Sequence, residues 1–253
     1  MNIFIDLAQM NIFIGELIGT TVLILLGGGV VANVSLAKSK GNGSDWIVVA
    51  TGWGFAVALA VYIAGWASGA HINPAVTLGL AAIGEQPWPE VPIYIAGQML
   101  GGFLGAVLVW AAYLPHWAQT DDKDAKLGVF CTAPAIRHTV GNLICEIIGT
   151  AMLLMGVLGI QNEHNELGSG LGPYLIGILV FGIGLSLGGP TGYAINPARD
   201  LAPRIAHAIL PIPGKRDADW SYAWIPIVGP IIGGVAGAVI YTVLFGQLSP
   251  LNP

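Results

Sequence analysis

Charged side chains are scarce in this sequence. Asp, Glu, Lys and Arg make up 9% of its 253 residues, against roughly a quarter in soluble domains, whereas hydrophobic residues make up 55%. This composition excludes an ordinary soluble surface and predicts a protein that crosses the lipid bilayer several times. The nine Lys and Arg residues form no continuous stripe and the formal net charge is −5, so we expect no nucleic-acid partner.

Cysteine is nearly absent as well. Cys131, in a polar loop, and Cys145, in an apolar run, have neither metal-ligand nor Cys-x-x-Cys spacing, so we expect two unpaired thiols and no metal site. No nucleophile, base and orienting group share a recognisable arrangement, so we expect no catalytic residue, no cofactor and no enzyme activity. Four histidines without ligand spacing are interpreted as loop residues: His116, His138, His164 and His207.

Long apolar runs are abundant instead. A spanning helix needs about 20 mostly apolar residues, and six windows qualify: 12–36, 46–66, 91–114, 140–160, 171–188 and 223–245. No basic region precedes the first window and no small-residue cleavage site follows it, so we expect that helix to be retained. Two further apolar pieces, 74–83 and 197–210, are too short to cross, and we expect each to dip into the membrane.

Both short pieces begin with the same tripeptide, Asn73-Pro74-Ala75 in the first and Asn196-Pro197-Ala198 in the second. Pro is tolerated at the first position of a helix because that N–H has no intrahelical partner, and the Asn before it is a favoured cap. The positive end of each half-helix dipole therefore points toward its asparagine. Plain helix capping would explain one such turn, but the symmetric pair favours a shared pore.

The two halves of the chain repeat. Each opens with Glu-x-x-Gly-Thr, at Glu16 and at Glu146, and each holds three expected spans, so the second copy is inverted relative to the first. Inverted repeats with broken helices that meet near the midplane mark a transport site. We therefore expect one transmembrane domain over 1–253, with internal repeats of about 1–125 and 126–253.

Glycines recur at four-residue spacing inside two of the expected spans. Small residues one turn apart let membrane helices approach closely, so we expect a tightly packed bundle. The glycines concerned are Gly97, Gly101, Gly105, Gly229, Gly233 and Gly237.

Together, the twin Asn-Pro-Ala turns and the inverted repeat resemble the major intrinsic protein family, the aquaporins and glycerol facilitators, over nearly the whole chain. Asp200 directly after Arg199, and Pro226-Ile227 in the last span, resemble the glycerol-conducting branch. The resemblance implies an aquaporin-like, all-α membrane protein with six transmembrane helices plus two half-membrane helices. It also implies a homotetramer in the cell membrane, with a pore in each chain and with cytoplasmic termini.

Loop charges point to the opposite orientation. All nine Lys and Arg fall on the side opposite both termini if the chain threads as six spans, and the positive-inside rule would place that side in the cytoplasm. We follow the resemblance, because the packing of the repeats constrains the fold more than a few loop charges do.

The resemblance assigns a selectivity filter to Trp53, Gly184, Tyr193 and Arg199. An unpaired arginine within the membrane is costly enough to indicate function. Arg199 would donate hydrogen bonds to solute hydroxyls while the two aromatic rings pack against carbon and Gly184 leaves room. Tyr193 stands where a glycerol facilitator is expected to have phenylalanine, and its hydroxyl would narrow and polarise the ring. Ordinary helix packing or an interfacial belt is the alternative for Trp53 and Tyr193.

Other polar residues are expected to support the pore loops. Glu16 and Glu146 either relay protons or accept hydrogen bonds from the irregular backbone before each half-helix, and we favour the second role. His71 would turn its carbonyl to the pore and hold the loop through its ring. Asp200 would pair with nearby backbone or with Arg204 and widen the mouth.

These features predict a passive channel for glycerol and other small uncharged solutes, with water, that excludes ions and protons. Urea and peroxide are further candidate permeants. A water-selective aquaporin is the near alternative, disfavoured by Gly184 and Asp200. An ion-coupled inverted-repeat transporter that uses Glu16 or Glu146 is a more distant one, and an adhesion or scaffolding role has no long tail to support it.

Overall fold

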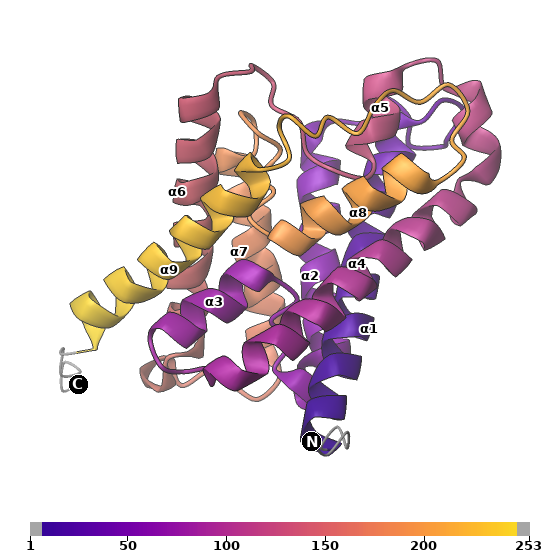
Figure 1. The fold of residues 1–253 in the computed structure, drawn as a ribbon. Helices are drawn as coiled ribbons and strands as arrows, with labels where there is room; N and C mark the ends of the chain where they lie inside the picture. The colour runs from indigo at the N-terminus through magenta and orange to yellow at the C-terminus, as the bar shows by residue number, and fades with distance from the viewer. Residues whose placement is uncertain (1–6, 247–253) are drawn as a thin grey trace.

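The computed structural model describes residues 7–246, so the parts of the expected domain at 1–6 and 247–253 lie outside it. Over those residues the chain forms helices joined by loops, without strands (Figure 1). Six long helices correspond to the six expected spans: α1 (Leu7–Ser35), α2 (Trp46–Ser68), α4 (Val91–Ala112), α6 (Thr139–Gln161), α7 (Leu171–Leu187) and α9 (Ile225–Phe245). Five are long and apolar enough to cross a membrane, and α7, at 17 residues, lies at the lower end of the spanning range.

The two expected half-helices are present as α3 (Pro74–Ala82) and α8 (Pro197–Ile209), each with its asparagine as N-cap and its proline at the first position. The all-α fold predicted from the sequence is therefore confirmed. The remaining helices are single turns or little more: η1 (Trp88–Glu90), η2 (Leu114–Gln119), α5 (Lys123–Gly128) and η3 (Glu163–Asn165).

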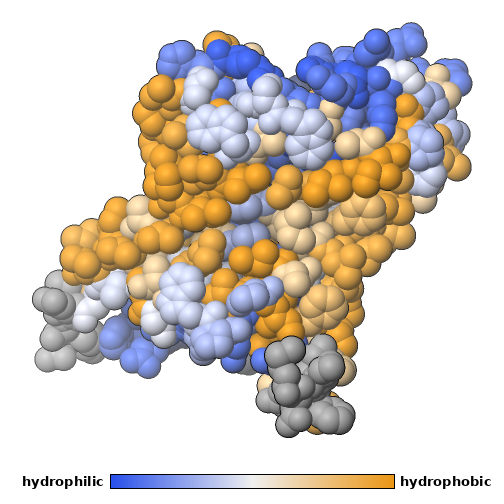
Figure 2. All heavy atoms as spheres, viewed as in Figure 1, coloured by the Kyte–Doolittle hydropathy of each residue, from blue (hydrophilic) through white to orange (hydrophobic). Residues whose placement is uncertain are grey.

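The outer surface has an apolar band between two polar ends. Figure 2 shows hydrophobic residues around the middle of the molecule and hydrophilic residues above and below them. Exposed tryptophans such as Trp66, Trp88, Trp220 and Trp224 fit the aromatic belts of membrane proteins. The chain is a multi-pass membrane protein.

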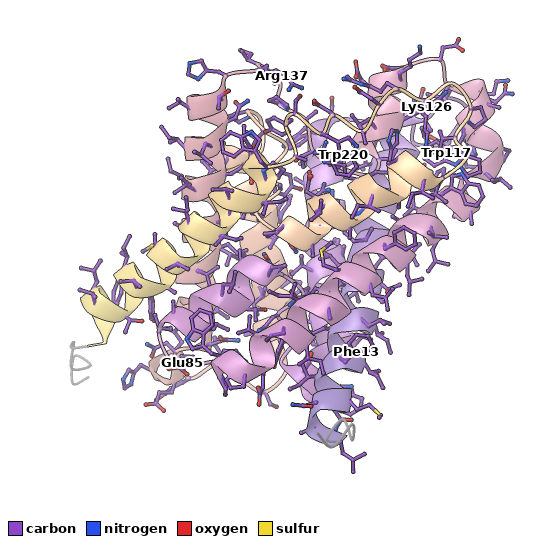
Figure 3. All side chains as sticks on the ribbon, viewed as in Figure 1. Phe13, Glu85, Trp117, Lys126, Arg137 and Trp220 are labelled. Carbon is purple, nitrogen blue, oxygen red and sulfur yellow. The ribbon has the colours of Figure 1, made fainter. Side chains whose placement is uncertain are left out.

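Both ends of the described chain lie on one face, because α1 begins and α9 ends there (Figure 1). Glu85 lies near that face, whereas Lys126 and Arg137 lie at the opposite one (Figure 3). These two basic residues thus lie away from the termini, as the threading of six spans predicts.

Each half-helix packs against the last long helix of the other half. Helix α3 lies on α9 and α8 lies on α4, while α2 and α7 meet between the halves. Within each half, α1 packs against α2 and α4, and α6 packs against α7 and α9. The two repeats are therefore interlocked.

Glycine makes these approaches possible. A Cβ on Gly105 of α4 would lie 2.7 Å from the carbonyl oxygen of Thr21 in α1, and one on Gly234 of α9 would lie 2.6 Å from that of Ala75 in α3. The close packing predicted from the glycine spacing is confirmed, since Cβ atoms on Gly101 and Gly233 would likewise overlap carbonyl oxygens of the neighbouring helices.

We expect Gly105→Ala to lower stability, because its methyl group would push α4 away from α1 at a cost of about 1–3 kcal/mol. Gly182→Ala in α7 is the matched control, since a Cβ there meets nothing within 4 Å and removing a helical glycine stabilises by roughly 0.5–1 kcal/mol. Thermal unfolding in detergent measures both. Equal melting temperatures for the two variants would contradict the role of close contact.

The segment between α4 and α6 is more than the connection expected from the sequence. Its side chains Trp117, Leu127, Phe130 and Cys131 are fully buried. The interpretation of His207 as a loop residue is wrong: it lies in α8, buried, with its ring centroid 5.4 Å from that of Phe130. The segment between α4 and α6 is rich in turns, so its buried apolar residues have no regular spacing. The sequence therefore did not predict that it packs against α8.

Both cysteines are free thiols, as predicted. Cys131 is buried rather than exposed in a polar loop. Across residues 7–246, no three His, Cys, Asp or Glu side chains come together in a way that could hold a metal ion.

Candidate functional site

Asn73 and Asn196 lie between the tips of α3 and α8, and both are buried. Each side-chain oxygen caps its own half-helix: that of Asn73 accepts from the backbone N–H of Ala75 at 2.9 Å, and that of Asn196 accepts from those of Ala198 and Arg199 at 3.0 and 3.1 Å. The capping predicted for both turns is present.

The two asparagines also cross-link the loops. The Asn73 Nδ2 donates to the carbonyl of Ile195 at 2.8 Å, and the Asn196 Nδ2 donates to the carbonyl of Ile72 at 2.8 Å. An amide group has two N–H donors, so each asparagine keeps one after this bond. Both residues line the same cavity, where those donors can meet a solute oxygen.

The cavity has a volume of about 470 Å³ and runs between the two halves. One wall is aliphatic, with side chains such as Leu23, Val57 and Val180. The other includes the consecutive residues 69–73 and 193–196, so the backbone itself forms part of the surface. A cavity lined by both apolar side chains and polar backbone suits a solute whose carbon and hydroxyl faces differ.

That backbone has an unusual conformation that the sequence did not reveal. Ala70 and Ile72 have positive φ values of 49° and 45°, and Tyr193 and Ile195, at the same offsets before the second asparagine, have 39° and 42°. The left-handed region costs non-glycine residues of the order of 1–3 kcal/mol each and persists only where the surroundings fix it. The repetition of this strain in both loops indicates function.

Glu16 fixes the first loop. Its carboxylate is fully buried and accepts four hydrogen bonds: from the backbone N–H groups of His71 (2.9 Å) and Ile72 (2.7 Å), and from the side chains of Ser68 and Gln98 (2.7 Å each). Four donors saturate the two oxygens, which leaves no acceptor site open to the cavity.

Glu146 does the same in the second loop with fewer partners. It accepts from the backbone N–H groups of Ala194 at 3.0 Å and Ile195 at 2.8 Å, the residues equivalent to His71 and Ile72. The position of Gln98 is taken by Pro230 in the second repeat, which has no side-chain donor.

His71 anchors its loop through the ring as well as the backbone. Its Nδ1 lies 3.1 Å from the Thr77 hydroxyl in α3, and its ring stacks on Tyr94 with centroids 4.4 Å apart. His71 therefore ties the loop to both α3 and α4, and it also lines the cavity.

Arg199 follows the second Asn-Pro-Ala turn and reaches the cavity. Its guanidinium carbon lies 4.0 Å from the ring centroid of Trp53, which is cation–π geometry. Among residues 7–246, no acceptor forms a hydrogen bond or ion pair with the guanidinium. Arginine has only donors, so the N–H groups that face the cavity can bind a solute oxygen.

Tyr193 and Trp53 line the cavity beside Arg199, but Gly184 does not. A Cβ on Gly184 would lie 2.8 Å from Cζ of Tyr193 and 3.0 Å from its hydroxyl, so the space that this glycine leaves is filled by Tyr193. The Tyr193 hydroxyl is buried there and has no hydrogen-bond partner among residues 7–246. Gly184 thus stands behind the expected ring, and the hydroxyl points away from the passage that it was expected to polarise.

Asp200 joins both partners expected for it. Its carboxylate accepts from the backbone N–H and hydroxyl of Thr132 at 2.7 Å each and from Nε of Arg204 at 2.8 Å. Arg204, also fully buried, donates on to the carbonyls of Thr132 and Ala218. This network fastens the segments on either side of α8 to that helix. No sequence pattern marks Thr132 as a member of it.

The family model described as Major intrinsic protein matches residues 5–241. The chain is 66% identical over 236 residues to the "Probable glycerol uptake facilitator protein" of Thermotoga maritima, covering 93% of this chain and 100% of that protein. It is 56% identical over 236 residues to the "Glycerol uptake facilitator protein" of Bacillus subtilis, covering 93% and 85%. The X-ray structure of the aquaglyceroporin from Plasmodium falciparum superposes with a TM-score of 0.85 at 31% identity, covering 94% of this chain and 98% of that one.

Proposed function

We propose, since this chain belongs to the major intrinsic protein family, that it is a passive membrane channel for glycerol and other small uncharged solutes, with water. The observation that carries the proposal is the cavity between the half-helices, where Arg199, which forms no ion pair with any carboxylate of residues 7–246, lies beside two aromatic rings. The names of the two bacterial relatives agree with it. The chain is a channel and not an enzyme.

The proposed filter works by two-sided contact. The guanidinium of Arg199 donates to the hydroxyl oxygens of a polyol, and the faces of Trp53 and Tyr193 pack against its carbon atoms. The solute then passes the strained backbone of the loops and the free N–H groups of Asn73 and Asn196. Solute molecules pass in single file and meet these groups one after another, so a slim neutral molecule exchanges its water shell for protein contacts gradually.

Ions and protons are excluded in this proposal by charge and orientation. Arg199 and the positive ends of α3 and α8 raise the energy of a cation in the passage. A water molecule between Asn73 and Asn196 must turn its oxygen toward both amides, which interrupts the donor chain that proton transfer needs.

The alternatives fit less well. A proton-coupled transporter needs a carboxylate that a solute or ion can reach, whereas Glu16 is saturated by four donors. A water-selective pore would need a narrower ring of side chains around Arg199. Asp200 was expected to widen the mouth of the pore, and its network holds the neighbouring segments against α8.

Four finer points belong to the proposal. Urea and peroxide are further permeants, because both are small and neutral. Four chains form a homotetramer, which would cover part of the exposed apolar surface. Both termini lie in the cytoplasm, following the family resemblance. The pore supports are Glu16, Glu146, His71 and Asp200.

Proteoliposomes test the proposal. Vesicles are mixed rapidly with glycerol in the outside solution, and their swelling as glycerol enters is followed by light scattering. The measurement is repeated with imposed proton or sodium gradients. We expect glycerol flux well above that of empty vesicles and indifferent to either ion gradient, since a passive channel has no step coupled to an ion. A flux that follows an ion gradient would favour the transporter instead.

A further inference from the structure

Behind Tyr193, outside the cavity wall, lies a residue that the function described so far does not use. Trp46 begins α2, and its indole N–H donates to the carbonyl of Gly184 in α7 at 2.9 Å. Its ring meets the ring of Tyr193 edge to face, with centroids 5.8 Å apart and planes at 78°. Trp46 therefore touches the filter from the side away from the solute.

Gly184 of α7 and Gly188, the C-cap residue of that helix, complete the enclosure. A Cβ on Gly188 would lie 2.6 Å from Cδ1 of Tyr193 and 2.6 Å from Cζ2 of Trp46, and one on Gly184 would lie 2.8 Å from Cζ of Tyr193. The Tyr193 ring is thus held between one turn of α7 and the indole. Because its hydroxyl has no hydrogen-bond partner, packing alone fixes the ring.

We propose that Trp46 is a positioning residue for solute selection: with Gly184 and Gly188 it sets how far the Tyr193 ring stands from Arg199, and hence the largest solute that passes. The inference rests on the proposed function of the passage as the solute pathway.

The direction of the effect follows from the packing. Tyr193 sits on a backbone with φ of 39°, whose loop is fixed at Ala194 and Ile195 by Glu146. The loop therefore keeps its place when Trp46 is shortened, and only the ring is released. Trp46 does not line the cavity that Tyr193 and Arg199 line. The volume vacated by its indole therefore lies outside the cavity wall, and we expect the Tyr193 ring to move into it and the passage to widen.

The experiment compares linear polyols of three, four and five carbons, and water, in proteoliposomes of wild type, Trp46→Phe and Trp46→Ala. We expect the ratio of five-carbon to three-carbon flux to rise by about tenfold in Trp46→Ala, the low end of what one methylene is worth in a pocket. The ratio should rise less in Trp46→Phe, because phenylalanine keeps an aromatic ring although it loses the indole N–H. Water flux reports that the pore is intact.

Trp220→Ala is the matched control. Trp220 is another exposed tryptophan, on the face opposite the termini (Figure 3), and among residues 7–246 the ring that pairs with Tyr193 is that of Trp46 and not that of Trp220. Its polyol ratio should equal that of wild type. An unchanged ratio in both Trp46 variants, or a fall in all fluxes without a change of ratio, overturns the positioning role. Wild-type vesicles that pass no three-carbon polyol would instead overturn the proposed function.

Discussion

Replacing Arg199 with alanine is expected to make the channel leak small cations by one to two orders of magnitude. A unit charge about 5 Å from the guanidinium is repelled by about 3 kcal/mol at an effective dielectric constant near 20, which corresponds to about a hundredfold in passage. The half-helix dipoles remain and keep part of the barrier. Sodium or proton flux into vesicles, measured with an entrapped dye, gives the result, and glycerol should still pass.

Arg199→Lys separates charge from shape. Lysine keeps the positive charge but lacks the planar fork of five donors that arginine presents. We therefore expect this variant to remain tight to cations while it binds polyol hydroxyls less well and conducts glycerol more slowly. Cation flux in Arg199→Ala no greater than in Arg199→Lys would show that exclusion resides elsewhere, in the asparagines and the half-helix ends.

Removing the Glu16 carboxylate is expected to prevent the first re-entrant loop from folding. Glu16→Leu leaves four buried donors unpaired, and each costs about 1–3 kcal/mol, a total comparable with the 5–15 kcal/mol that stabilises a typical protein. Glu146→Leu leaves two backbone N–H donors and the Thr191 hydroxyl, fewer than Glu16→Leu, and should be less damaging. The yield of monodisperse protein in detergent and its melting temperature should fall in that order.

Glutamine variants test the competing role of these carboxylates. Glu16→Gln keeps the shape and one acceptor, so we expect intermediate stability and, in the protein that folds, ordinary glycerol flux. A proton relay would give the reverse result, normal stability with transport lost. Leucine variants as stable as wild type would contradict the supporting role itself.

The sequence predicted the architecture because membrane burial leaves strong signals. Twenty apolar residues in a row, a proline after an asparagine and glycines one turn apart each have one dominant physical meaning in a bilayer, and the corresponding helices and contacts are present. The buried carboxylates could be matched to backbone N–H groups for the same reason, since a charge within an apolar run needs partners.

What the sequence did not reveal depends on contacts between distant segments. Nothing local marks Trp46 as a partner of Gly184, 138 residues later. The left-handed conformations of Ile72 and Ile195 fall on β-branched residues that would be expected to avoid them. Gly184 was assigned to the pore wall by its position relative to the motifs. Tyr193 packs on that side of α7 and fills the volume that the missing Gly184 side chain leaves.

The exchange of hydrogen bonds between the two loops bears on how the chain is made. The amide of Asn73 finds its acceptor only at Ile195, and that of Asn196 donates back to Ile72. The first re-entrant segment therefore leaves the ribosome well before its partner exists, and the membrane cannot supply the missing bond. The two loops can therefore join to complete the wall of the passage only late in biogenesis, after the second repeat has been inserted.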